Sequence, residues 1–247
     1  MFRTMILVVG LSLMAPVATA IEGAAVTYEV NGQPYEGYYV SPSAEAPFVL
    51  LLHDWDGLTG YEIKRAQMLA ELGYQVFAAD LFGAGVRPTK VEDRRQHTGE
   101  LYKDREKMRA LMDGAIAAAA AQGANVDRAV AMGYCFGGAA VLELARAGAD
   151  MRGFVTFHGG LGTPEGQDYS KVHGEILVLH GSADTAISLD DFAALGKQLE
   201  QAGVGHEMIS YSGAPHAFTV FGGERYREQA DRKSWNRFVA FLREQLQ

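Results

Sequence analysis

The sequence of 247 residues contains one cysteine, Cys135. A lone cysteine cannot close a disulfide within its own chain, so a disulfide framework is excluded. Runs of Lys and Arg are also absent and the formal net charge is −8, which argues against binding to nucleic acid or to an anionic membrane surface. The sequence has neither a His-x-x-x-His pair nor a cysteine cluster. We therefore expect no metal and no cofactor.

Internal repeats, low-complexity tracts and linker-like segments are absent as well. Hydrophobic residues make up 48% of the chain and charged residues 21%, a balance typical of a globular domain rather than of a disordered chain. The length is sufficient for one well-buried core. We therefore predict a single domain over residues 21–247; the pattern predicts no particular oligomeric state.

The first 20 residues have the order of a secretory signal peptide. Arg3 precedes the apolar stretch 5–14, and the small residues Ala18-Thr19-Ala20 follow. The alternative is a membrane anchor, but the apolar run is too short to span a bilayer comfortably. We predict cleavage near Ile21 and export to the periplasm or the medium, with no membrane attachment afterwards. Because Arg3 is the only charged residue removed, the net charge would change from −8 to −9.

From about residue 48 onward, short apolar runs alternate with helical patterns. Continuous apolar strands are typical of a parallel sheet covered on both faces. Before them, residues 25–30 and 35–40 predict an antiparallel hairpin turning at Asn31-Gly32. We therefore predict an α/β fold with a mostly parallel, doubly wound sheet and an N-terminal antiparallel hairpin. The other predicted strands are residues 48–53, 75–79, 128–132, 153–157, 175–180 and 206–211, and the predicted helices are residues 63–72, 100–121, 137–147, 188–201 and 224–245.

The cysteine lies in the segment Gly133-Tyr-Cys-Phe-Gly137, which follows a predicted strand and starts a predicted helix. This is the context of a nucleophile elbow, in which the glycines allow a tight strand-to-helix turn. A thiolate at Cys135 would lie near the positive end of the following helix, which favours the reactive form. The alternative is a structural cysteine that packs as a small hydrophobic residue. The setting favours a nucleophile.

An acid and a base follow the cysteine in the chain order expected of a triad. Asp184 comes four residues after His180, the end of a predicted strand, and His216 lies between the last predicted strand and the last helix. Both positions fall at the carboxyl edge of the sheet, where open α/β sheets place their sites. Asp190 and Asp191 are rival acids, but capping of a helix start explains them. We predict that His216 is the base and that Asp184 orients it.

The loop 53–57, which follows the first central strand, is the place from which a second oxyanion-hole N–H is supplied in this arrangement. We expect the two donors to be the backbone N–H groups of Phe136 and Trp55. Asp54, in the same loop, would approach Cys135 and influence its protonation state. The alternative for Asp54 is an ordinary loop carboxylate in water.

These motifs resemble the dienelactone hydrolases of the α/β-hydrolase superfamily. The resemblance covers about residues 25–245, and it is specific because most α/β-hydrolases carry serine at the elbow. The matching segments are Gly133-Tyr-Cys-Phe-Gly-Gly138, Asp184, Gly213-Ala-Pro-His-Ala-Phe218 and Asp80-Leu-Phe82.

The resemblance implies an α/β-hydrolase fold and a Cys–His–Asp triad at Cys135, His216 and Asp184. It also implies that Asp54, which stands where the best-known members have a longer glutamate, controls the proton of the cysteine in the resting enzyme. Hydrolysis by such a triad needs no cofactor.

Two departures concern the substrate. Family members that cleave dienelactone carry an arginine four residues after the histidine, and here that position is Val220. A second arginine is expected shortly after residues 80–82, where only Arg87 lies nearby, so Arg87 is the candidate for substrate binding. Residues 83–103 are interpreted either as a partial lid or as a solvated loop. Dienelactone as the substrate therefore does not follow from the resemblance.

The leading hypothesis is a hydrolase of small-molecule carboxylic esters or lactones that works through an acyl-thioester intermediate. The alternative is a catalytically silent binding protein with the same fold, since fold alone does not establish activity. A thiol-redox function is disfavoured because the chain has no resolving cysteine.

Overall fold

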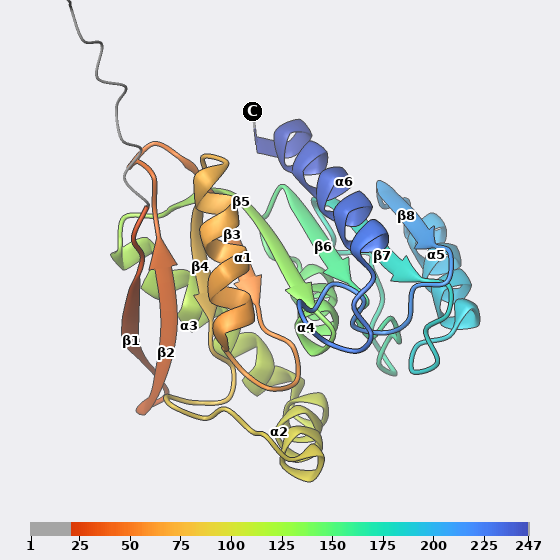
Figure 1. Ribbon diagram of the computed structural model, residues 1–247, viewed down its shortest axis with the longest axis horizontal. Helices are drawn as coiled ribbons and strands as arrows, with labels where there is room; N and C mark the ends of the chain where they lie inside the picture. The colour runs from red at the N-terminus through yellow and green to blue at the C-terminus, as the bar shows by residue number, and fades with distance from the viewer. Residues whose placement is uncertain (1–20, 247) are drawn as a thin grey trace, which may run out of the picture.

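The computed structural model describes residues 21–246 (Figure 1). The predicted signal peptide, residues 1–20, lies outside the described residues. Eight strands form one sheet in the order β1-β2-β4-β3-β5-β6-β7-β8. β1 pairs with β2 and β2 with β4 in antiparallel fashion, and the other neighbours are parallel. The strands are β1 (Ala24–Val30), β2 (Gln33–Val40), β3 (Pro47–Leu52), β4 (Gln75–Ala79), β5 (Asn125–Tyr134), β6 (Gly153–Phe157), β7 (Glu175–Gly181) and β8 (His206–Tyr211).

This architecture confirms the predicted mostly parallel, doubly wound sheet with its N-terminal hairpin. The hairpin turns at Asn31 and Gly32, both with positive φ (51° and 75°), a conformation that Asn and Gly adopt readily. β4 and β6 are buried along their whole length, and β3 along all but its first residue. Their continuous apolar sequences therefore reflect cover on both faces of the sheet.

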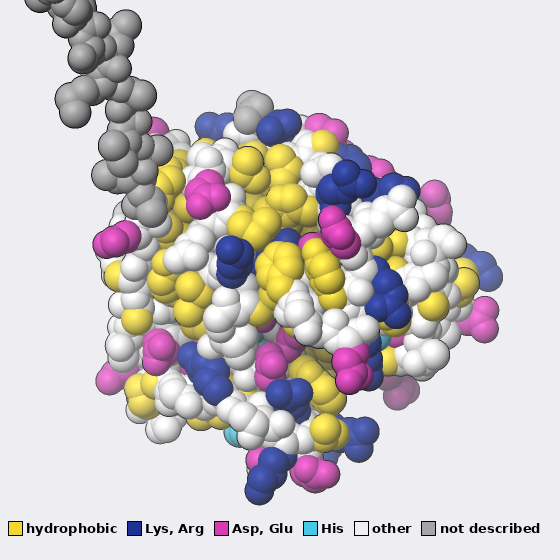
Figure 2. Space-filling model, viewed as in Figure 1, with side chains coloured by type: hydrophobic (Ala, Val, Ile, Leu, Met, Phe, Trp, Pro, Cys, Tyr) yellow, Lys and Arg dark blue, Asp and Glu magenta, His cyan; other side chains and the backbone are white. Residues whose placement is uncertain are grey.

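Helices cover the two faces unequally. α1 and α6 pack on one face, whereas α3, α4 and α5 pack on the other (Figure 1). Figure 2 shows hydrophobic side chains gathered at the surface between α1 and α6. The helices are α1 (Gly60–Glu71), α2 (Val91–Lys103), α3 (Arg105–Ala121), α4 (Phe136–Arg146), α5 (Leu189–Ala202) and α6 (Glu228–Leu246). Within residues 21–246, none of these is long and apolar enough to cross a membrane.

The prediction of one continuous helix over residues 100–121 is wrong. The chain forms two helices there, because Asp104 ends α2 and caps the start of α3, accepting a hydrogen bond from the Lys107 N–H at 2.9 Å. Most of the segment 83–103 is therefore helical, and α2 lies beyond the carboxyl ends of the parallel strands (Figure 1).

Candidate active site

The turn between β5 and α4 holds Cys135 in a strained backbone conformation, with φ 51° and ψ −110°. Such a conformation at a non-glycine residue persists only where the surroundings impose it. A Cβ atom at Gly137 would lie 2.3 Å from the carbonyl oxygen of Leu52, and one at Gly133 would lie 2.3 Å from that of Gly137. Only glycine fits at these two positions, so close packing of backbone on backbone fixes the elbow.

The structure brings the three predicted triad residues into one chain of contacts. His216 Nε2 lies 3.1 Å from Cys135 Sγ, and His216 Nδ1 lies 2.8 Å from Asp184 Oδ2. Asp184 Oδ1 accepts the backbone N–H groups of Ala186 and Ile187 at 2.8 and 2.9 Å. Burial alone would raise the pKa of Asp184, but the hydrogen bonds from His216 and Ile187 outweigh it and lower that pKa. Asp184 is thus an ionised carboxylate able to stabilise a charged imidazole.

The thiol itself is held in its neutral form. Burial raises the pKa of Cys135 to about 12, and the Asp54 carboxyl group adds to the rise. Burial also raises the pKa of Asp54 to about 9, assisted by the neighbouring Asp56. A thiol of this kind needs a base at the moment of attack, and His216 is in contact with it.

One of the two predicted oxyanion donors, the N–H of Phe136, lies at the Cys135 sulfur. The N–H of Phe136, the first residue of α4, acts on the Cys135 sulfur and lowers its pKa against the larger effect of burial. The loop carrying Trp55 is held by His53, whose Nε2 accepts the Leu81 N–H at 3.0 Å while its Nδ1 lies 2.5 Å from the Asp54 carbonyl oxygen. The sequence interpretation gave His53 no part in this loop.

A pocket of about 270 Å³ lies between the loop after β3, α2 and the segment after His216, and its lining includes Ala217, the residue that follows His216. Val220 lines this pocket, and it stands at the position where the resemblance to dienelactone-cleaving proteins implies a substrate-binding arginine. Arg94 of α2 lines it too, stacked on Trp55 at 5.2 Å and 3.6 Å from the carboxylate of Asp56. The full lining is Asp54, Trp55, Asp56, Arg94, Ala217, Val220, Gly223, Glu224 and Arg225.

Two arginines, Arg94 and Arg225, therefore border this pocket, and sequence reasoning missed both. Arg87, the predicted substrate-binding residue, is not part of its lining. Its guanidinium lies 3.7 Å from Asp80 and 3.8 Å from Glu36. No pattern in the sequence indicates Arg94, because it reaches the pocket only through the position of α2 in the fold.

Tyr102, at the end of α2, is a further residue at the site that the sequence did not single out. Its ring stands edge-on to Phe136 at 5.5 Å. Burial raises the pKa of Tyr102, and the nearby Cys135 adds to that rise. The last turn of α2 therefore lies beside the turn that holds Cys135.

Three carboxyl groups lie close enough together to be considered as metal ligands. Oxygens of Asp54, Asp56 and Glu62 lie within 4.8 Å of one another. Glu62 Oε2, however, accepts the N–H and the hydroxyl of Thr59, both at 2.8 Å, in the capping box of α1. Burial raises the pKa of Glu62 to about 7. Helix capping accounts for Glu62, and the Asp54–Asp56 pair lies in the loop after β3.

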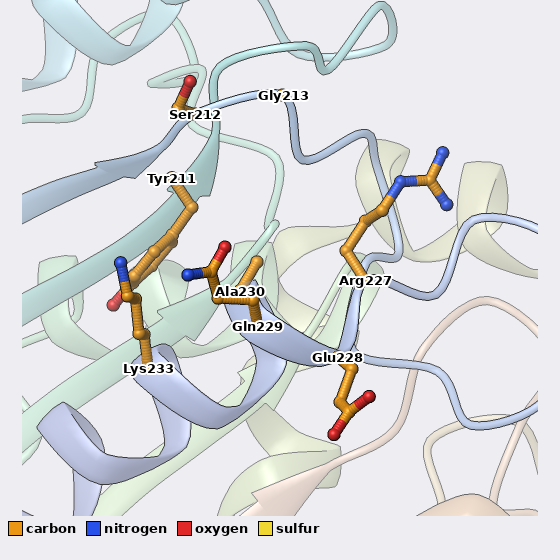
Figure 3. Close-up of a pocket in the computed structure, with 8 residues that line it drawn as sticks. All are labelled: Tyr211, Ser212, Gly213, Arg227, Glu228, Gln229, Ala230 and Lys233. Carbon is orange, nitrogen blue, oxygen red and sulfur yellow. The ribbon is translucent and has the colours of Figure 1, made fainter.

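A separate pocket of about 240 Å³ lies where β8 meets the start of α6. Figure 3 shows that Arg227 points away from Lys233 there, so the two cations do not converge on a common point. Its lining contains neither a triad residue nor a sequence neighbour of one, whereas the pocket of about 270 Å³ includes Ala217, which follows His216. The pocket that includes Ala217 is therefore the candidate substrate pocket.

A doubly wound sheet with a strained cysteine in the turn between β5 and α4, followed along the chain by an aspartate and a histidine in contact with it or with each other, is the arrangement typical of the α/β-hydrolase class. The model of the dienelactone hydrolase family matches residues 35–246, and the chain belongs to this family.

Individual relatives agree. The solved structure named m3DLH is 30% identical to this chain. The match covers 93% of this chain and 100% of m3DLH, with a TM-score of 0.87. P91, a dienelactone hydrolase-like promiscuous phosphotriesterase from metagenomic libraries, is 27% identical over the same shares, with a TM-score of 0.86. Protein usf of Aquifex pyrophilus is 26% identical over 91% of this chain and 99% of its own.

Proposed function

We propose that the protein hydrolyses carboxylic esters or lactones, with Cys135 as nucleophile, His216 as base and Asp184 as the group that orients the base. One observation carries this proposal: a continuous contact path from Sγ through the imidazole to an ionised carboxylate, 3.1 Å and 2.8 Å long in its two steps. Membership of the dienelactone hydrolase family supports hydrolysis as the reaction type.

The first half-reaction forms a thioester. The thiol proton passes to His216 Nε2 as the sulfur electron pair attacks the substrate carbonyl carbon. The carbonyl electrons move to oxygen, which the N–H groups of Phe136 and Trp55 stabilise. When the tetrahedral intermediate collapses, the C–O bond to the leaving group breaks, and the imidazolium returns its proton to the departing oxygen. Asp184 stabilises the imidazolium between these two transfers.

The second half-reaction consumes water. His216 takes a proton from water, whose oxygen attacks the thioester carbonyl. Collapse breaks the C–S bond, releases the acid and returns the proton to sulfur. Because the pKa of Cys135 is raised to about 12, the enzyme rests as a thiol between cycles. We assign Asp54 to this control above a pH of about 9, where its carboxyl group is ionised and its negative charge adds to the rise.

The residues that line the pocket narrow the class of substrate. Guanidinium groups bind carboxylates through charge-assisted hydrogen bonds, and Arg94 and Arg225 both border the pocket. We therefore propose that the acyl part of the substrate carries a carboxylate. The export predicted for residues 1–20 would place this reaction in the periplasm or outside the cell. N-terminal sequencing of the native protein tests that part: a first residue near Ile21 supports export, and Met1 contradicts it.

The proposed chemistry is tested by assaying the mature protein on aryl esters, lactones and a dienelactone. We expect Cys135→Ala to lower kcat by more than about 1000-fold, because the triad acts as a unit. Full activity in that variant would overturn the proposal. For substrate class, Arg94→Gln should raise KM about 10-fold for a carboxylate-bearing ester and leave a neutral ester unchanged. The same selective rise in Arg87→Gln instead would assign the carboxylate to Arg87.

A further inference from the structure

His158 is a buried histidine that the proposed reaction does not use. It follows β6 directly and has a φ of +40°, a strained conformation for a non-glycine residue. Its backbone N–H donates to the Leu179 carbonyl oxygen at 2.8 Å, and the carbonyl oxygen of the preceding Phe157 accepts the N–H of Cys135 at 3.0 Å. The backbone that holds His158 is therefore tied to the nucleophile.

The His158 ring faces the loop that carries the base. Its centroid lies 5.4 Å from that of His216, at an interplanar angle of 65°, and 5.5 Å from that of Phe218. Its Nε2 lies 2.8 Å from the hydroxyl oxygen of Thr219. One ring thus packs against two side chains of the loop and makes a hydrogen bond with a third. The ring has no solvent exposure, and no partner for its Nδ1 lies within residues 21–246.

Thr219 is where the loop is held. Its side chain is fully buried, and its hydroxyl also lies 2.7 Å from the hydroxyl of Tyr61. Its carbonyl oxygen accepts a hydrogen bond from Arg65 at 2.9 Å. Tyr61 and Arg65 both belong to α1, whereas His158 belongs to the sheet edge that bears Cys135. Of these three contacts, the one with His158 relates the base to the nucleophile.

The charge state of His158 is compatible with close packing against the His216 ring. Burial, together with the neighbouring His216, lowers the pKa of His158 well below its ordinary value. The ring is therefore neutral at physiological pH. A charged group in its place would oppose the imidazolium that forms on His216 when the thiol gives up its proton.

We propose that His158 is a positioning residue for the catalytic base: its ring supports the His216 imidazole, and its hydrogen bond to Thr219 sets the distance between His216 and Cys135. This inference rests on the proposed function, because it presumes that His216 is the base. A displacement of about 1 Å at a catalytic group lowers a rate by on the order of 100-fold. Loss of the bond should therefore act on kcat and on thiol reactivity rather than on substrate binding.

The test uses Thr219→Val, which removes the hydroxyl and keeps the branched shape. We expect kcat to fall about 10- to 100-fold with KM within about 2-fold of wild type. The apparent pKa for alkylation of Cys135 by iodoacetamide should move upward. Thr219→Ser, which restores a hydroxyl, should recover kcat to within about 3-fold of wild type. A second variant, His158→Asn, whose side chain tolerates positive φ, should reproduce the Thr219→Val effect.

Tyr61→Phe is the matched control, since it removes the other partner of the Thr219 hydroxyl and leaves His158 in place. A loss of kcat in Tyr61→Phe as large as in Thr219→Val would overturn the proposal. So would wild-type kcat and alkylation profiles in both Thr219→Val and His158→Asn, even with a lowered Tm. The failure of the underlying function looks different: Cys135→Ala would then retain activity.

Discussion

The two halves of the site are held by different kinds of contact. The nucleophile turn rests on backbone packed against backbone, with a Cβ at Gly137 only 2.3 Å from the Leu52 carbonyl oxygen. The loop carrying His216 has backbone packing at its start, since a Cβ at Gly181 would lie 2.2 Å from the Ala214 carbonyl oxygen, but beyond His216 it is held largely by side chains. The buried guanidinium of Arg65 is paired with Asp231 and lies 4.1 Å from the ring centroid of Phe221.

This difference separates a fixed element from an adjustable one. The elbow has no side chain whose rotation could relieve an added atom, so it tolerates nothing larger than hydrogen at its glycines. The base loop depends on hydrogen bonds and one ion pair, and removal of one partner leaves the rest of the loop able to shift. We expect substitutions at the elbow to prevent correct folding there, and substitutions in the His216 loop to lower stability or activity in part.

The largest effect should come from Gly137→Ala. The new methyl group would meet two carbonyl oxygens, those of Leu52 at 2.3 Å and His53 at 2.5 Å, neither of which can rotate away. We expect a loss of at least about 3 kcal/mol in the free energy of unfolding, or no soluble protein. Urea denaturation followed by far-UV circular dichroism measures it.

Gly99→Ala provides the control for that substitution. Gly99 lies inside α2, and nothing stands within 4 Å of an added Cβ. The alanine should be neutral or stabilise the protein by up to about 1 kcal/mol, because glycine is unfavourable in a helix. Equal losses in Gly137→Ala and Gly99→Ala would contradict the steric account of the elbow.

Arg65→Met should have the next largest effect. It removes the cation and leaves the Asp231 carboxylate buried and unpaired, which costs about 3–5 kcal/mol in comparable cases. Thermal unfolding reports the change, and the double variant Arg65→Met/Asp231→Leu should recover much of it because both charges are then gone. A single variant as stable as wild type would show that the ion pair does not hold the base loop.

The smallest effect is expected in the pH dependence of kcat/KM, which the ionisation of Asp54 next to the elbow should change. The pKa of Asp54 is raised to about 9 by burial, so the group is neutral below that pH and negative above it. Its ionisation opposes the negative charge that develops on sulfur and on the oxyanion. We therefore expect kcat/KM to fall as pH rises through about 9, and this fall to be absent in Asp54→Asn. Identical alkaline limbs in the two proteins would refute the assignment.

The same contrast explains what the sequence predicts well. The elbow is local: Gly133, Cys135 and Gly137 lie within five residues, next to an apolar strand and a helix, so the turn can be identified without a structure. The positions of Asp184 and His216 follow from strand ends, because the carboxyl ends of parallel strands share one edge. Their contacts agree with that expectation.

The support of the base loop cannot be predicted in this way. Arg65 meets Asp231 across 166 residues, and Tyr61 meets Thr219 across 158. No pattern in the sequence links such residues. The pocket arginines show the same limit, since Arg94 reaches the site only because α2 folds over the carboxyl edge, while Arg87, closer to the expected register, pairs with Asp80 instead.

The central claim is a covalent bond to Cys135, and peptide mass spectrometry of the acid-quenched enzyme tests it most directly. After brief mixing with p-nitrophenyl acetate, the account predicts one acetyl group on the peptide that contains Cys135. It also predicts that neutral hydroxylamine removes this group, as expected of a thioester, and that Cys135→Ala carries none. Turnover of the ester without acyl transfer to Cys135, or with an acyl group on another residue, would contradict the account.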